Sequence, residues 1–105
     1  MAYETVNYED VEPVGDGMHF LRKPLGCETV GLTVVELDGE WVGMEHDHAD
    51  DDHEEVYLVI DGEATVTVEG EAVELGAGDA IKVEPDATRQ LSSADGGLLV
   101  IAGAP

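Results

Sequence analysis

Short segments of the chain alternate hydrophobic and polar residues or are rich in β-branched residues, and both patterns are typical of β-strands. The strictest alternation lies in residues 64–69, ATVTVE, which predicts a strand with one buried face. Residues 28–37, ETVGLTVVEL, are rich in valine and threonine and predict another strand. The remaining strand-like segments are residues 18–23, 40–45, 55–61, 73–75, 80–83, 88–92 and 98–102.

Glycine, aspartate and proline separate these segments. Asp38-Gly39 and Asp61-Gly62 are dipeptides typical of hairpin turns, and Pro85 ends a strand. No segment has a convincing helical period. Many short strands divided by turns predict an all-β sandwich or barrel. The length of 105 residues suits one domain.

The charge of the chain is extreme, because 25 Asp and Glu residues face only 4 Lys and Arg residues, for a net charge of −21. Self-repulsion at this density destabilises a compact fold in dilute buffer, whereas molar salt shortens the Debye length to about 3 Å. The acids are spread over the whole chain, a pattern that resembles proteins of halophilic organisms. Nucleic acids and anionic membranes are disfavoured as partners, since phosphate contacts need a basic surface.

The sequence also favours a cytoplasmic location. No apolar run approaches the length needed to span a bilayer, and the acidic N-terminal segment lacks the pattern of a secretory signal. Cys27 is the only cysteine, so no internal disulfide can form. We therefore expect a soluble cytoplasmic protein.

The candidate chemistry lies in residues 43–62, GMEHDHADDDHEEVYLVIDG. His46 and His48 are two residues apart, so in extended backbone both side chains point to the same face, and His53 and Glu55 share this spacing. Two such pairs meeting across the intervening loop would surround one point with imidazoles and a carboxylate. These donors suit a divalent first-row metal. The alternative is a solvated acidic loop that contains a few histidines.

This stretch resembles the first signature of the cupin family, which has a glycine, a His-x-His pair, a glutamate and a further glycine. Here these positions are Gly43, His46 and His48, Glu55 and Gly62. Six residues separate His48 from Glu55, where the family usually has fewer. The loop between the two parts of the signature is therefore longer than usual.

Residues 78–90, GDAIKVEPDATRQ, resemble the second cupin signature, which runs from Gly-Asp through an apolar strand and a proline to a histidine. Asp86 stands where the turn glycine usually is, and Arg89 stands where the histidine that serves as the fourth metal ligand usually is. The resemblance covers residues 32–101. It implies a single cupin jelly-roll β-barrel over residues 30–105, an N-terminal extension with edge strands over residues 1–29, and a homodimer.

Three further residues, Arg89, Tyr57 and Trp41, each have alternative roles. Arg89 forms a surface ion pair, or neutralises Glu55 in the barrel mouth and so removes that carboxylate from metal binding, or clamps a carboxylate or phosphate of a ligand. Alternation places Glu55 and Tyr57 on the inner face of one strand, so Tyr57 lines a ligand pocket or packs in the core. Trp41, the only tryptophan, is a core or dimer anchor or a pocket wall.

The spacing and the resemblance together predict a divalent transition metal (Fe, Mn, Ni or Zn) held by His46, His48, His53 and Glu55, in which His53 partly offsets the missing fourth histidine. The resemblance also implies a small organic ligand. Such a protein is a metal-dependent enzyme of isomerase, dioxygenase or lyase type, or a sensor. One alternative is a metal-free ligand-binding cupin whose site has lost the fourth histidine at Arg89. Another is a structural domain whose acidic loop binds hydrated cations loosely.

Raising the salt concentration from low to molar levels is expected to raise the melting temperature steeply, because salt screens the repulsion among the carboxylates. Thermal denaturation followed by circular dichroism over a series of KCl concentrations measures this dependence. A melting temperature that stays flat across the series would contradict the halophilic interpretation.

Overall fold

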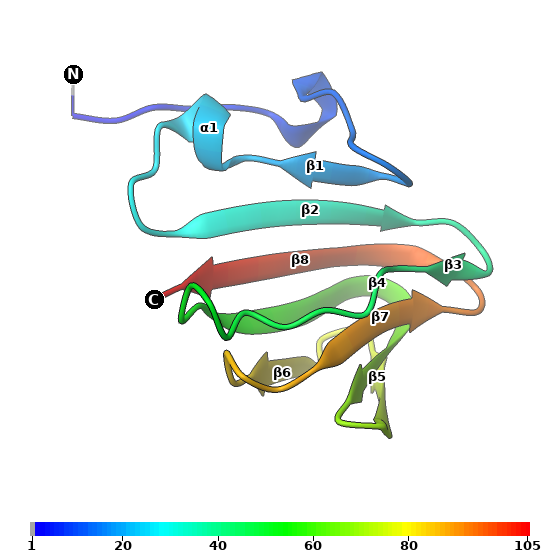
Figure 1. Ribbon diagram of the computed structural model, residues 1–105. Coiled ribbons are helices and arrows are strands. Elements are labelled where there is room, and N and C mark those ends of the chain that lie inside the picture. The colour runs from blue at the N-terminus through cyan, green and yellow to red at the C-terminus, as the bar shows by residue number, and fades with distance from the viewer. Residues whose placement is uncertain (1) are drawn as a thin grey trace.

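The structure, a computed structural model, describes residues 2–105 and consists mainly of antiparallel β-strands (Figure 1). Residue 1, the start of the predicted N-terminal extension, lies outside the described residues. The strands are β1 (Met18–Phe20), β2 (Gly31–Leu37), β3 (Trp41–Val42), β4 (Glu54–Val68), β5 (Glu71–Gly76), β6 (Ala80–Val83), β7 (Arg89–Ser93) and β8 (Gly97–Ala104). A 3-10 turn, η1 (Tyr8–Asp10), and a single helical turn, α1 (Arg22–Leu25), precede β2.

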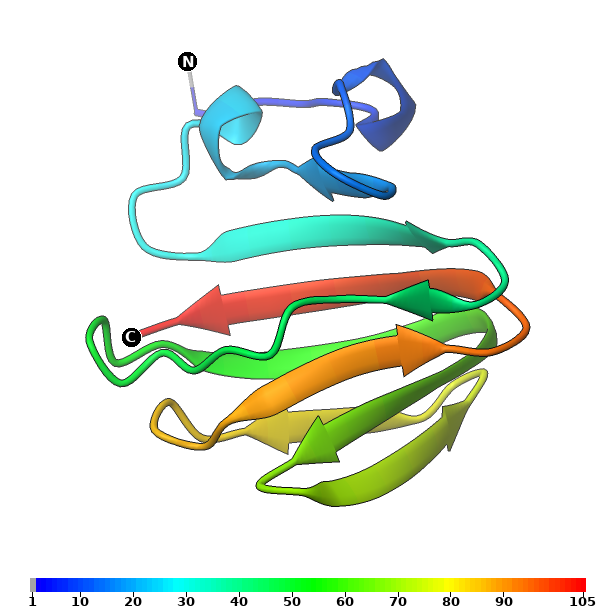
Figure 2. The same cartoon turned by 45° about the vertical axis from the view of Figure 1, so that its right-hand side comes forward.

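Strand β4 organises the sheet. The strand order is β1-β2-β8-β4-β7-β3, and β5 and β6 also pair with β4. The first half of β4 pairs with β6 and β8, and its second half pairs with β5 and β7. The sheet curls around this strand, so that β3 and β7 face β8 across the core (Figure 2). The predicted all-β barrel is confirmed.

The turn predicted at Asp61-Gly62 is wrong, because residues 54–68 form one continuous strand. The register between β4 and β8 shifts between Val59 and Asp61, which is a β-bulge, and a bulge bends a strand without reversing it. Gly62 has a φ of 78°, and a Cβ added there would lie 2.2 Å from the carbonyl oxygen of Gly96. Glycine is thus required for the bend that carries β4 from one sheet to the other.

Two further boundaries differ from the sequence prediction. The turn at Asp38-Gly39 does not close a hairpin, since β2 pairs with β8 whereas β3 pairs with β7. The strand predicted over residues 18–23 ends at Phe20, and α1 follows it. The helical turn ends at Gly26, whose left-handed φ of 69° suits a glycine cap. In both places the local sequence marks a turn, but strands that are distant in the sequence decide which strands pair on either side of it.

The core lies between the inner faces of the curled sheet. In β4, Tyr57 and Val59 are at most 1% exposed, whereas Val56 and Ile60 on the outer face are 39% and 49% exposed. This is the alternation predicted from the sequence. The buried cluster consists of Val35, Leu37, Trp41, Tyr57, Val59, Ala64, Val66, Leu75, Val83, Leu91, Leu99 and Ile101.

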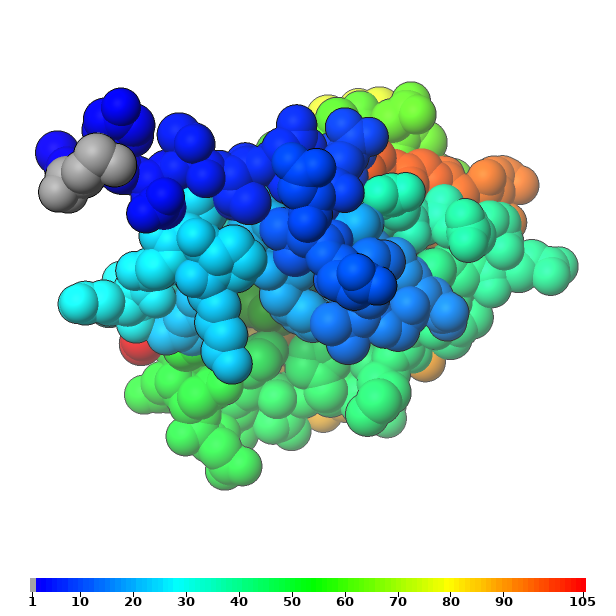
Figure 3. All heavy atoms as spheres, turned by 90° about the horizontal axis from the view of Figure 1, so that it is seen from above, coloured from blue at the N-terminus to red at the C-terminus, as the bar shows by residue number. Residues whose placement is uncertain are grey.

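The described N-terminal residues lie across the face of the molecule that is turned toward the viewer in Figure 3. His19 anchors it, because its ring nitrogens lie 2.8 Å from the carbonyl oxygen of Val11 and 2.9 Å from Glu36 Oε1. His19 is therefore a buried histidine with both nitrogens hydrogen-bonded, as expected for a structural residue. The division of the chain at residue 30 stays a prediction. No helix of residues 2–105 is long and apolar enough to cross a bilayer.

Replacing Gly62 by alanine is expected to destabilise the protein much more than replacing Gly70, although both glycines have a left-handed φ. Gly70→Ala meets nothing within 4 Å and should cost about 1 kcal/mol for backbone strain alone. Gly62→Ala adds a collision with backbone atoms of Gly96 and Gly97, so we expect about 3 kcal/mol or more. Urea denaturation in molar KCl measures both, and equal losses would contradict the role assigned to the bulge.

Candidate metal centre

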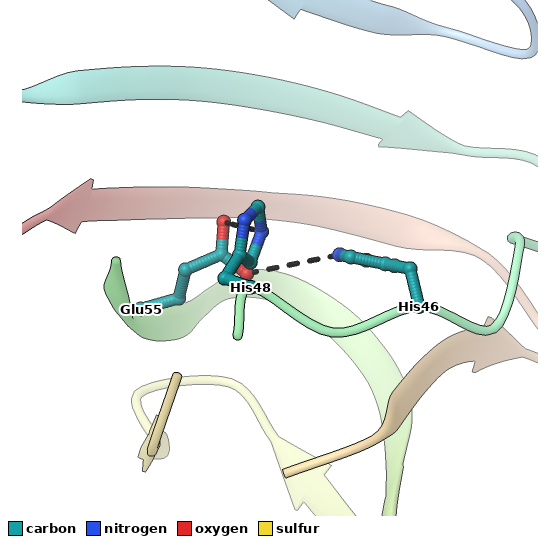
Figure 4. Close-up of side chains that lie close together, drawn as sticks. All are labelled: His46, His48 and Glu55. Carbon is teal, nitrogen blue, oxygen red and sulfur yellow. Dashed lines mark ion pairs between the residues drawn. The ribbon is translucent and has the colours of Figure 1, made fainter. Parts of the chain in front are cut away.

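Three side chains with metal-ligating atoms converge near the start of β4 (Figure 4). His46 and His48 come from the segment between β3 and β4, and Glu55 comes from β4 itself. One ligand atom from each lies within 4.8 Å of the others. His48 Nε2 is 3.3 Å from Glu55 Oε2, and His46 Nε2 is 4.0 Å from Glu55 Oε1. Figure 4 shows both imidazoles directed toward the carboxylate.

Backbone hydrogen bonds to residues of the second signature hold the segment that carries the two histidines. His46 and Arg89 exchange a pair of bonds, His46 N to Arg89 O at 2.9 Å and Arg89 N to His46 O at 2.8 Å. The amide of His48 donates to the carbonyl oxygen of Pro85 at 2.8 Å. The two imidazoles therefore share one face of this segment, as their spacing predicts, with ring centroids 5.1 Å apart.

The long loop after His48 folds back on itself and orients the His48 ring. The amides of Asp51 and Asp52 donate to the carbonyl oxygen of His48, and Asp51 Oδ2 lies 3.1 Å from His48 Nδ1. This hydrogen bond lowers the pKa of the Asp51 carboxyl below its ordinary value. A carboxylate on Nδ1 favours the tautomer that leaves the Nε2 lone pair free toward Glu55, as in carboxylate–histidine pairs at metal sites.

His53 lies beside this cluster and belongs to a second group. Its ring stacks on His48 with centroids 5.9 Å apart, and His48, Asp51 and His53 also place one ligand atom each within 4.8 Å of the others. The four residues predicted to form one site, His46, His48, His53 and Glu55, are thus divided between two overlapping groups that share His48. The only sequence signal for Asp51 as a partner of His48 is the run of acidic residues beside the histidines.

Arg89 is completely buried and forms an ion pair with Glu55. Its Nη1 donates to Glu55 Oε1 at 2.9 Å, and the side-chain exposures are 0% for Arg89 and 15% for Glu55. Nε donates to the carbonyl oxygen of Ala87 at 2.9 Å, and Nη2 donates to the carbonyl oxygens of Glu84 and Pro85. Of the three roles considered for Arg89, this geometry corresponds to the neutralisation of Glu55. The guanidinium has no exposed surface.

Tyr57 completes the surroundings of Glu55. Its hydroxyl donates to Glu55 Oε1 at 3.0 Å, and its ring is buried. Burial and, second, the charge of Glu55 raise the pKa of the Tyr57 hydroxyl well above its ordinary value, so it stays a neutral donor at physiological pH. Glu55 Oε1 thus accepts hydrogen bonds from Tyr57 and Arg89, while Oε2 faces His48.

Comparison with protein families identifies the fold family of this site. Residues 33–101, about two thirds of the chain, match the family model described as a cupin domain. The chain belongs to the cupin family. Arg89 lies within the residues that match.

Solved structures of other cupins have the same fold. A cupin protein of Bacteroides fragilis is 30% identical, with a TM-score of 0.72 over 95% of this chain and 86% of that one. An RmlC-like cupin of Shewanella frigidimarina is 25% identical, with a TM-score of 0.78 over 100% of this chain and 95% of that one. Both alignments extend over nearly the whole barrel.

One curated protein also matches part of the sequence. A LexA repressor of Mycolicibacterium paratuberculosis is 43% identical over an alignment of 71 positions that covers 63% of this chain. The cupin chain spans only 29% of the length of that repressor.

The donor set of the cupin site fits a divalent transition metal. Two imidazole nitrogens and one carboxylate oxygen are the ligands of the two-histidine, one-carboxylate sites that leave open positions on the metal. Ligand bonds of about 2.1 Å place neighbouring donors roughly 3 Å apart. The 3.3 Å separation of His48 Nε2 and Glu55 Oε2 is close to this value, and His46, whose side chain is 42% exposed, has room to approach.

An apolar cavity of about 230 Å³ adjoins the donor cluster at His46. Its lining consists of Met18, Trp41, Gly43, Met44, His46, Tyr57, Leu91 and Ile101. The sequence indicated Trp41 and Tyr57 as pocket candidates but missed the two methionines, Leu91 and Ile101. Alternation on β7 and β8 does place Leu91 and Ile101 on inner faces, but it does not distinguish a cavity wall from packed core.

Replacing Arg89 by methionine is expected to lower the free energy of unfolding by about 3–5 kcal/mol, because it leaves the Glu55 carboxylate and three carbonyl oxygens without their partner. Denaturation by urea in molar KCl measures the loss. Lys82→Met is the matched control, since Lys82 forms an exposed ion pair with Glu84 at 2.8 Å and should change stability little. Similar losses in the two variants would show that the buried pair does not stabilise the barrel.

Proposed function

We propose that this cupin holds one divalent transition metal ion, Fe, Mn, Ni or Zn, through His46, His48 and Glu55, and that the metal binds a small organic ligand. The convergence of two imidazole nitrogens and one carboxylate oxygen within 4.8 Å carries this proposal. Three protein ligands leave positions open for a ligand. When bound, the metal would supply Lewis-acid or oxygen-binding chemistry.

The residues around the donor atoms orient them for metal binding. Asp51 orients His48 so that Nε2 faces the cluster, and Tyr57 and Arg89 fix the carboxylate of Glu55 through Oε1. Glu55 then offers Oε2 to a metal. Because Arg89 compensates the charge of Glu55, a bound dication would keep more of its positive charge and polarise a ligand more strongly. His53, stacked on His48, is the nearest further imidazole and the candidate for an additional ligand.

A metal-free, ligand-binding or sensing cupin is the second candidate function. The Arg89–Glu55 ion pair favours it, because a guanidinium occupies the position of the usual fourth ligand and competes for the carboxylate. In this alternative the apolar cavity binds the ligand without help from a metal.

Three further expectations stay predictions. They are turnover of isomerase, dioxygenase or lyase type, a halophilic origin, and a homodimer. The outer face of β4 suits a dimer contact, since Val56 and Ile60 are apolar and 39% and 49% exposed in a chain of charge −21. A second copy of the chain presents the same two apolar side chains, so contact there would bury them against each other.

Elemental analysis of untagged protein purified in molar salt tests the metal centre. We expect close to one transition metal ion per chain, and a loss of about tenfold or more in occupancy for His48→Ala, which removes a donor common to both groups. His46→Ala and His53→Ala form the matched pair, because each removes one imidazole from only one group. Loss in His46→Ala with retention in His53→Ala supports the proposed ligands.

The reverse result, with metal retained in His46→Ala and lost in His53→Ala, would move the site to His48, Asp51 and His53. Absence of metal from the wild-type protein, even after anaerobic loading with Fe(II), Mn(II), Ni(II) or Zn(II), would refute the metal centre. The metal-free alternative would then be the better description.

A further inference from the structure

We propose that the ligand of this cupin consists of a metal-chelating head and an apolar body, an aromatic ring or branched alkyl group, and that this body occupies the cavity beside His46. The chelating head of the ligand rests on the proposed metal centre, whereas the apolar body rests on the cavity alone. The proposal names a ligand class whose larger part is apolar.

The lining of the cavity is the first observation behind this assignment. Met18, Met44, Leu91, Ile101 and the ring of Trp41 surround a space of about 230 Å³ with carbon and sulfur atoms. The hydroxyl groups of a sugar placed there would give up hydrogen bonds to water and gain almost none in return. An apolar group in the same place loses nothing on leaving water and gains contacts with the walls.

The two polar residues in the cavity wall, Tyr57 and His46, direct their polar atoms toward the donor cluster. The Tyr57 hydroxyl donates to Glu55 Oε1, and His46 belongs to the donor cluster through its ring. Both side chains thus present ring carbons to the cavity while their polar atoms serve the cluster. A ligand bound at an open metal position would therefore direct its remaining atoms along His46 into the cavity.

The size and the opening of the cavity define the body more closely. A cavity of about 150 Å³ with aliphatic and aromatic walls accommodates benzene, so the larger space here suits a substituted ring or a branched chain. Met44 is 83% exposed whereas Trp41 is 7% exposed, which places the opening beside Met44 and the closed end at the core. Entry past Met44 needs no movement of the strands.

Trp41 provides a direct readout, because it is the only tryptophan and lies in the cavity wall. Two hydroxamates, acetohydroxamate and benzohydroxamate, share a chelating head and differ only in the body. Titrated into Zn(II)-loaded protein, benzohydroxamate should bind about tenfold or more tightly than acetohydroxamate and should change the Trp41 fluorescence. Toluene should change the same fluorescence in metal-free protein.

Met18→Gln places a polar group of similar size in the cavity wall, and Met44→Gln does so at the exposed opening, where folding is not at risk. Both variants should reduce the preference for benzohydroxamate about threefold or more, with acetohydroxamate affinity and zinc content unchanged. Val42→Gln is the control, because Val42 lies beside Trp41 but is 64% exposed and outside the cavity lining.

Equal affinities for the two hydroxamates in zinc-loaded protein would overturn the proposal while leaving the metal centre intact. A preference that Val42→Gln reduces as much as both cavity variants would overturn it as well. If the protein binds none of Fe(II), Mn(II), Ni(II) and Zn(II), the metal centre fails separately, and the toluene titration of metal-free protein tests the cavity. A toluene-induced change in Trp41 fluorescence that Met44→Gln weakens then supports the apolar body. The absence of any fluorescence change refutes it.

Discussion

The buried ion pair between Arg89 and Glu55 connects the two halves of the candidate site. Arg89 lies at the start of β7 and Glu55 near the start of β4, and their side chains meet at 2.9 Å with the guanidinium out of contact with solvent. The same arginine donates to backbone oxygens of the loop before β7 and exchanges backbone bonds with His46. One residue therefore fixes the loop, the carboxylate and the first histidine together.

This pairing changes the chemistry expected of a cupin barrel. A histidine at the position of Arg89 would add a neutral ligand, whereas the guanidinium adds a fixed positive charge within hydrogen-bonding distance of a carboxylate ligand. In the proposed metal centre, Glu55 would be a donor with one oxygen already hydrogen-bonded, and there would be one protein ligand fewer. The cost of burying the arginine is offset because its donors reach a carboxylate and three carbonyl oxygens.

The protein also separates its polar and apolar surfaces sharply. Carboxylates cover the outside of a chain with a net charge of −21, whereas the cavity beside His46 is walled almost wholly by apolar side chains. Affinity that arises from apolar contacts is insensitive to the screening of charges, so the proposed binding of an apolar group in this cavity would persist at salt concentrations that weaken ionic recognition.

Local patterns in the sequence determined the strands, their inner faces and the pairing of His46 with His48, because side-chain direction in extended backbone alternates with a period of two residues. The family signatures likewise indicated the barrel. Only the tertiary structure decided that Asp61-Gly62 bends a strand, that Arg89 turns inward to Glu55, that His53 stacks beside the cluster, and that a cavity remains at Met18 and Leu91. Each of these depends on contacts between segments far apart in the chain, and local patterns do not encode such contacts.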